Sequence, residues 1–280
     1  MNQSEIKITD LIDRENMKSD PSFGYWNDSN KEKKKAFNVE VGFDRLEKSP
    51  HLNDIFKQLI SCMSVSNLSE ENKSILSLGS GTCWLESWWL KEKKPNNLVA
   101  VDFSKHRIHE LAPMTFEHYG YNYPIQLIRG DFLNLGMEED LFDIVLLSQA
   151  FHHSQDPVKL LREVWRLSKD QARILIIGEH FFGKLDHTKQ ALRHFVKFLI
   201  NYKNYRQSHP FIPGYSDLFP PHIEQGDNHY SKVEYNQMFE EVGNFNVNHL
   251  IAKKEGKGPR RSVLIIAFSG EEKGLLALSS

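Results

Sequence analysis

Residues 74–84 read SILSLGSGTCW, a short apolar run that ends in two closely spaced glycines. The run predicts a buried β-strand over Ser74–Leu78, and the residues after it predict a helix. Gly79 and Gly81 permit a sharp turn between the two and let a ligand approach backbone that a Cβ atom would block. Such a turn is also common where no ligand binds, so by itself it is a weak signal.

A carboxylate strengthens this signal at the end of the next predicted strand. Asn97–Val101 is followed by Asp102, about twenty residues beyond the glycines. An acid at this position can accept hydrogen bonds from two ribose hydroxyls. Together, the glycine turn and Asp102 indicate a nucleoside cofactor.

Further along, apolar runs alternate with helical patterns, which indicates βαβ units around a mostly parallel sheet and an α/β fold. A helix is predicted to begin at Asp156-Pro157, where Asp can cap it and Pro suits its first turn. The later predicted strands are Ile125–Arg129, Ile144–Ser148, Arg173–Ile177, Phe245–Ile251 and Ser262–Phe268.

The chain divides into an arm and one larger domain. Residues 1–50 are polar and weakly periodic and predict an N-terminal arm or lid. Residues 51–280 hold the predicted domain, with a cap inserted at about 181–230, where the segment is longer than one crossover helix needs.

Composition excludes several classes of protein. With 35 basic and 37 acidic side chains, the formal charge of −2 recruits neither nucleic acid nor anionic lipid. The polar start predicts no secretory signal, and no apolar run reaches the roughly 20 residues of a membrane helix. Two cysteines and 13 histidines show no metal-ligand spacing, so no metal is expected. We expect a cytoplasmic protein and leave a homodimer open.

The order of the motifs resembles a known family. After the glycine turn and Asp102 come RGDF at 129–132, FDIVLLSQAFHH at 142–153 and then Asp156-Pro157. From Ser74 to about Glu179 this resembles the class I S-adenosylmethionine-dependent methyltransferases, type 11-like, and is similar to quinone-biosynthesis methyltransferases. The resemblance implies a Rossmann-like, mostly parallel sheet of seven strands, the last antiparallel, with S-adenosyl-L-methionine as cofactor.

The resemblance also implies which residues hold the cofactor. Glycine-turn residues would approach its methionine part, Asp102 its ribose, the aromatic and acidic residues its adenine, and the end of the fourth strand its amino-acid end. The implied residues are Gly79, Ser80, Gly81, Asp102, Phe103, Asp131, Phe132, Ser148 and Gln149.

Two positions depart from the family pattern. Ser77 stands where family members commonly carry an acid, so it offers no charge to the cofactor's ammonium group. Cys83 stands where a third glycine is common. These departures predict reduced cofactor affinity, or a substitute from the N-terminal arm.

Three histidines are candidates for a general base, because an ordinary histidine pKa suits proton removal near neutral pH. His152 and His153 are neighbours at a strand end and are expected to point to different sides; His180 ends the fifth strand. A structural role is the competing interpretation for each. Contacts to the acceptor are expected from Tyr25, Trp26, His222, His229 and Tyr230. The tryptophans of the helix after the turn, Trp84 among them, are expected to pack against the sheet.

The sequence therefore predicts methyl transfer from S-adenosylmethionine to an oxygen or nitrogen of a small molecule. Four alternatives stay open: a cofactor-binding protein without turnover, a tRNA methyltransferase, a protein methyltransferase, and a nicotinamide-dependent Rossmann enzyme. The third glycine of a nicotinamide fingerprint would fall on Trp84, which argues against the last.

Overall fold

The structure is a computed structural model of the 280-residue chain. It describes residues 6–11, 73–92, 97–120, 125–181, 230–243, 245–253 and 261–269, and residues 48, 49, 53, 56, 57, 95, 192, 196 and 228 singly.

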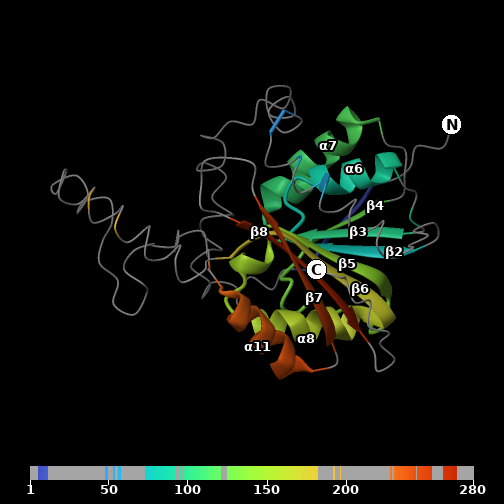
Figure 1. Cartoon of the computed structure of the whole chain (residues 1–280). Coiled ribbons are helices and arrows are strands. Elements are labelled where there is room, and N and C mark those ends of the chain that lie inside the picture. Colours follow the sequence, from blue (N-terminus) through green and yellow to red (C-terminus); the bar gives the residue numbers. More distant parts are fainter. Residues whose placement is uncertain are drawn as a thin grey trace.

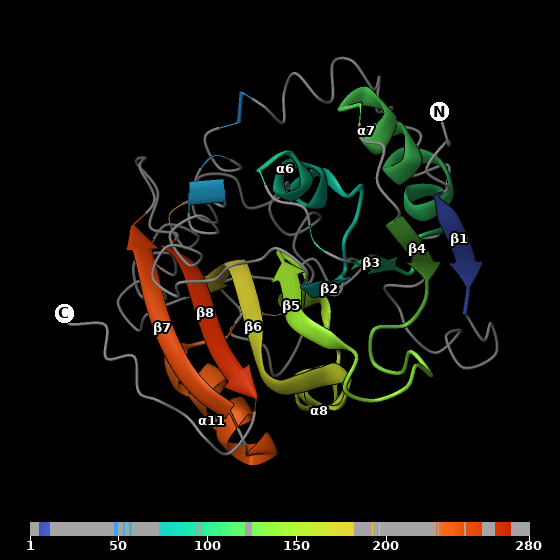
Figure 2. The ribbon, with the colours of Figure 1, turned by 90° about the vertical axis from the view of Figure 1, so that its right-hand side faces the viewer.

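The described residues form one eight-stranded sheet in the order β1-β4-β3-β2-β5-β6-β8-β7 (Figures 1 and 2). The strands from β1 to β6 in this order pair in parallel, whereas β8 runs antiparallel to both of its neighbours. The predicted α/β, Rossmann-like fold with a mostly parallel sheet and an antiparallel last strand is confirmed.

Each predicted strand has a counterpart in the structure, because β-branched and leucine-rich runs flanked by polar residues favour strands buried on both faces. The observed strands are β2 (Ser74–Leu78), β3 (Asn97–Asp102), β4 (Ile125–Arg129), β5 (Phe142–Ser148), β6 (Ser168–Phe181), β7 (Phe245–Lys253) and β8 (Arg261–Ser269).

The number of strands differs from the prediction of seven. β1 (Lys7–Asp10), within the predicted N-terminal arm, pairs in parallel with β4 and becomes an eighth strand at the edge of the sheet. The backbone of β1 pairs with that of β4, and the side chains of this short strand are mostly exposed. Because the strand has no apolar run, its sequence did not predict it.

Helices cover the two faces of the sheet (Figure 1). One face packs beneath α6 (Trp84–Glu92), the π-helical turn η1 (Arg107–Leu111) and α7 (Ala112–His118). The other packs against α8 (Pro157–Leu167) and α11 (Lys232–Val242). A short 3₁₀ turn, η2 (Phe151–His153), follows β5.

The predicted helix start at Asp156 is confirmed by its cap, and α11 has a cap as well. The Asp156 carboxylate accepts the backbone N–H of Lys159 at 2.9 Å and begins α8. Ser231 and Glu234 form a reciprocal capping box at the start of α11.

The strand order reverses direction at β2. From β2 the chain builds outward through β3 and β4, then crosses back to place β5 on the other side of β2. In open α/β sheets the crevice at the carboxyl ends of such strands is where ligands bind. Gly79 directly follows β2 with a φ of +66°, and a Cβ added there would lie 2.5 Å from the Cβ of Ala150, just after β5. The two strand ends therefore touch at a point where only glycine fits.

This contact predicts a large effect of Gly79→Ala on stability. Gly120 has a similar φ of +69° but open space around it, so Gly120→Ala measures the backbone strain alone. We expect Gly120→Ala to lower the free energy of unfolding by about 1 kcal/mol and Gly79→Ala by roughly 2 kcal/mol more, because Ala150 must move. Urea denaturation of both variants measures the difference, and equal losses would contradict the contact.

Candidate functional site

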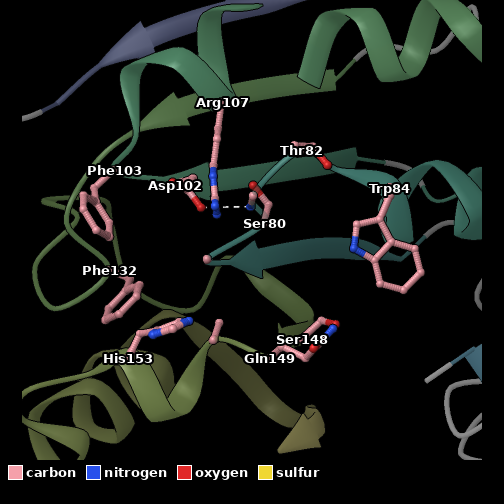
Figure 3. Close-up of a pocket in the computed structure, with 13 residues that line it drawn as sticks. Ser80, Thr82, Trp84, Asp102, Phe103, Arg107, Phe132, Ser148, Gln149 and His153 are labelled. Carbon is pink, nitrogen blue, oxygen red and sulfur yellow. Dashed lines mark hydrogen bonds between the residues drawn. The ribbon is translucent and has the colours of Figure 1, made fainter. Parts of the chain in front are cut away.

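A pocket of about 280 Å³ opens at the carboxyl ends of β2, β3 and β5 (Figure 3). Its wall combines backbone from the glycine turn with aromatic, hydroxyl and charged side chains. The lining residues are Gly79, Ser80, Gly81, Thr82, Trp84, Asp102, Phe103, Arg107, Phe132, Ser148, Gln149, Ala150 and His153.

The glycine turn is bonded to the end of β3. The backbone N–H of Ser80 donates to the carbonyl of Val101 at 2.9 Å, and that of Gly81 donates to Asp102 Oδ2 at 2.8 Å (Figure 3). The other Asp102 oxygen accepts the N–H of Ser104 at 2.8 Å. Each carboxylate oxygen can accept a further bond, so Asp102 can still receive two ribose hydroxyls.

Cys83 occupies the position of the expected third glycine with a φ of +57°, and its side chain is fully buried. A non-glycine residue in this left-handed region costs about 1–2 kcal/mol. Burial raises the pKa of its thiol, with Glu86 adding to the effect, so the sulfur stays protonated. Cys83 therefore keeps the glycine-like backbone of the turn, with an unreactive side chain.

Two aromatic rings lie at one end of the pocket, where Phe103 follows β3 and Phe132 follows β4 (Figure 3). They offer flat apolar faces to a base. Asp131, the predicted neighbour of the adenine, is not among the lining residues; its Oδ1 accepts the N–H of Leu133 at 2.9 Å within the turn after β4. Its contact with a cofactor stays a prediction.

The other end of the pocket is polar. Ser148, the last residue of β5, and Gln149, which follows it, lie there, and Trp84 and Thr82 come from the start of α6 and the turn before it (Figure 3). The Ser148 hydroxyl oxygen is buried and has no hydrogen-bond partner among the described residues. It is a polar atom that a bound ligand would satisfy.

Eight of the nine predicted cofactor residues line this pocket, all except Asp131. Sequence reasoning missed Thr82, Arg107 and Ala150, which have no motif, and assigned Trp84 to the core. Trp84 packs partly buried against the core beneath α6, as predicted, and also lines the pocket, while Leu85 and Trp89 on the same helix are buried against the sheet. The helical period places Trp84 and Leu85 on adjacent faces, which is why one of them reaches the pocket.

The expectation that His152 and His153 point to different sides is wrong. Their rings lie 4.1 Å apart between centroids at 44°, because residues 151–153 form a 3₁₀ turn rather than extended backbone. His153 lines the pocket. His152 Nδ1 lies 2.7 Å from Oε2 of Glu179, whose other oxygen accepts the N–H of Phe151 at 3.0 Å.

Glu179 was not predicted from the sequence. It is completely buried near the end of β6, next to a register shift between Ile176 and Glu179, where Gly178 has a φ of +72°. Such an irregularity re-aims a side chain, here toward η2. The Glu179 carboxylate thereby fixes the turn that carries both histidines.

The remaining predicted residues fall partly outside the described part of the chain. The Tyr230 ring lies 6.1 Å from that of Phe151 and 5.5 Å from that of Tyr235, between α11 and η2. His180 belongs to β6, but its side chain lies outside the described part of the structure. Four further predicted residues lie wholly outside it: Tyr25, Trp26, His222 and His229. The contacts predicted for these residues stay predictions.

A second buried acid lies below the glycine turn. Glu86, on α6, is 2% exposed and accepts a hydrogen bond from the Ser77 hydroxyl. Burial raises its pKa from the ordinary 4.5 to about 7; the Ser77 hydroxyl and the residue's own backbone N–H oppose the rise, and Asp102 adds to it. Near neutral pH this carboxyl is therefore balanced between its charged and neutral forms.

The described residues contain neither a metal-binding cluster nor a membrane-spanning helix. Among them, no group of three or more His, Cys, Asp or Glu side chains is placed to hold a metal ion. Within the same residues, no helix has the length and apolar character needed to cross a membrane.

The fold and the pocket define an α/β protein with a pocket at the switch point of its sheet, where proteins of this class bind their ligands. Residues 76–176 match the family model described as a methyltransferase domain. Over these residues the chain is therefore similar to methyltransferase domains, and its fold is that of the class I methyltransferases, as its motifs predicted. No curated protein matches the chain in sequence.

Solved structures share this fold at low identity. One is a proposed S-adenosyl-L-methionine-dependent methyltransferase of Methanococcus maripaludis, with a TM-score of 0.54 and 16% identity over 84% of this chain and 94% of that one. Another is a proposed sarcosine dimethylglycine methyltransferase of Galdieria sulphuraria, with a TM-score of 0.54 and 12% identity over 78% of this chain and 86% of that one. The [4+2]-cyclase SpnF is also similar in structure, with a TM-score of 0.56 and 11% identity over 77% of this chain and 81% of that one. The similarity to quinone-biosynthesis enzymes stays a prediction.

The raised pKa of Glu86 predicts a pH-dependent stability. Between pH 4.5 and about 7 the folded state keeps a proton that the unfolded state has released, so the free energy of unfolding falls as pH rises through this window. For the ligand-free protein, we expect the free energy of unfolding of the wild type to fall by up to about 3 kcal/mol, relative to that of Glu86→Gln, as the pH rises from 5 to 8. Urea denaturation at both pH values measures this, and a difference independent of pH would contradict the buried, proton-holding carboxyl.

Proposed function

We propose that this protein transfers a methyl group from S-adenosyl-L-methionine to an oxygen or nitrogen of a small-molecule acceptor. The observation that supports this most directly is the glycine turn bonded to Asp102 at the mouth of the pocket. The proposal needs this site as well as the fold, because the fold also occurs in a [4+2]-cyclase.

The pocket's chemistry fits the parts of this cofactor. Asp102 would accept the ribose hydroxyls, and Phe103 and Phe132 would flank the adenine. At the polar end, the unsatisfied hydroxyl of Ser148 would bond the amino-acid part. When bound, the cofactor supplies an electrophilic methyl group on a sulfonium, so the chain itself must hold the acceptor in line and exclude water.

Proton removal from the acceptor is assigned to a histidine. His153 lines the pocket, and its ring packs against that of His152, which Glu179 holds in place. In this proposal His153 takes the proton from the acceptor, and the Glu179–His152 pair keeps the turn in position. His180 remains the alternative base, because it lies near the end of β6, next to Glu179 along the chain.

The acceptor is assigned to a small molecule. The formal charge of −2 offers no general attraction for tRNA, which disfavours a nucleic-acid substrate. The acceptor's contacts would come from Tyr230 and from the predicted residues Tyr25, Trp26, His222 and His229. A cofactor-binding protein without turnover would use the same pocket, and only an assay of methyl transfer separates the two.

The ribose contact gives the first test. We expect Asp102→Ala to weaken binding of S-adenosylhomocysteine by at least about tenfold, because it removes charge-assisted hydrogen bonds to two hydroxyls. Calorimetry measures the affinity, and Asp170→Ala, an exposed acid on β6, is the matched control. Unchanged affinity in Asp102→Ala would contradict the proposed site.

The role of His153 is tested by turnover. With acceptors from a metabolite panel, His153→Ala should lower kcat by about 10²-fold or more while S-adenosylhomocysteine affinity stays within about twofold. Formation of S-adenosylhomocysteine from S-adenosylmethionine, followed by mass spectrometry, measures this. Full activity in His153→Ala together with loss in His180→Ala would move the base to His180.

A further inference from the structure

Ser77 and Glu86 form a polar contact on an otherwise apolar face of the sheet. Ser77 pairs in register with Ala100 on β3 and Leu146 on β5, both completely buried on the face that α6 covers. Across from it, Glu86 reaches down from α6 and accepts the Ser77 hydroxyl. A carboxyl placed among apolar residues is costly unless its bonding needs are met.

Those needs are only partly met by the described residues. Ser77 bonds Oε1 of Glu86, whereas Oε2 is buried without a hydrogen-bond partner among them. Besides its own backbone N–H, the groups that act on this carboxyl are Ser77 from β2, Cys83 from the turn and Asp102 from β3, and none of these is a cation. An ionised Glu86 therefore lacks a compensating positive charge among these groups.

The pocket lies directly beyond this contact. Ser77 precedes Gly79 by two residues, and Ser148, on the same face of β5 two residues after Leu146, lines the pocket with an unsatisfied hydroxyl. Glu86 therefore lies beneath the glycine turn, and it is not among the residues that line the pocket. Arg107, the cation in the pocket wall, comes from η1 and lies over Gly81.

We propose that Glu86, from beneath the residues that line the pocket, supplies the negative charge that attracts the α-ammonium group at the amino-acid end of the cofactor. This rests on the proposed function and names the residue that does what Ser77 cannot. A carboxylate on residue 77 would extend from β2 into the space that the Glu86 carboxyl now fills beside the Ser77 hydroxyl. The acid comes from α6, nine residues later, and not from the N-terminal arm.

Binding and protonation are then linked. With a pKa of about 7, the ligand-free Glu86 carboxyl is about half protonated at pH 7. A neighbouring ammonium favours the charged form, so binding should release roughly half a proton at this pH. A ligand without the ammonium should release none.

The test compares two ligands that share the nucleoside. S-adenosylhomocysteine carries the amino-acid end, and 5′-methylthioadenosine lacks it. We expect Glu86→Gln to weaken S-adenosylhomocysteine by about tenfold or more and 5′-methylthioadenosine by less than about twofold, measured by calorimetry. Glu110→Gln, an exposed acid on η1, is the matched control and should change neither.

A double variant that moves the carboxylate from α6 to residue 77 of β2 gives a second test. Ser77→Asp combined with Glu86→Gln should restore S-adenosylhomocysteine affinity to within about threefold of wild type. On the wild type alone, calorimetry in buffers of different ionisation enthalpy should detect proton release with S-adenosylhomocysteine and none with 5′-methylthioadenosine, which needs no variant to fold.

The outcomes separate this inference from the proposed function. If the wild type binds neither ligand, both are overturned. If it binds both, and Glu86→Gln weakens both equally or neither, Glu86 has only a structural role and the inference alone is overturned. Equal proton release with the two ligands overturns it as well.

Discussion

The hydrogen bond from the Gly81 N–H to the Asp102 carboxylate joins the ends of two neighbouring strands, and the pocket depends on it. It fixes the glycine turn over β3 while leaving each carboxylate oxygen able to accept another bond. Gly79 completes the arrangement, because its missing Cβ lets the turn after β2 touch Ala150 after β5. Because the strand order reverses at β2, the carboxyl ends of β2, β3 and β5 border a crevice. The glycine turn shapes the wall of this crevice.

Two buried acids near this crevice, Glu179 and Glu86, differ in how completely their carboxylates are hydrogen-bonded. Glu179 lies on the β6 side, where His152 and the Phe151 N–H bond both of its oxygens. Glu86 lies on the α6 side, where the described residues bond only one. A buried carboxylate with complete bonding stabilises its surroundings, whereas one with an unmet oxygen suits a ligand that brings the missing charge. This difference is the physical reason for assigning Glu179 to the scaffold and Glu86 to binding.

Much of the fold and most of the pocket followed from the sequence, because buried strands, caps and glycine turns are local patterns. Strands such as Ser74–Leu78 and the helix start at Asp156 were predicted correctly. The eighth strand was not, because Lys7–Asp10 is held by backbone pairing with a distant strand and has no apolar run. Glu86 and Glu179 were missed for a related reason: a single acid in a helix or strand reads as a surface residue until the fold buries it. The orientation of His152 and His153 depended on a turn that no propensity announced.

The most direct measurement of the central claim is a crystal structure of the protein with S-adenosylhomocysteine. We expect both ribose hydroxyls within hydrogen-bond distance of the Asp102 carboxylate, at about 2.5–3.0 Å. We also expect the adenine between Phe103 and Phe132 and the amino-acid end over the glycine turn toward Ser148. A ligand bound elsewhere, or one whose ribose does not contact Asp102, would contradict this claim.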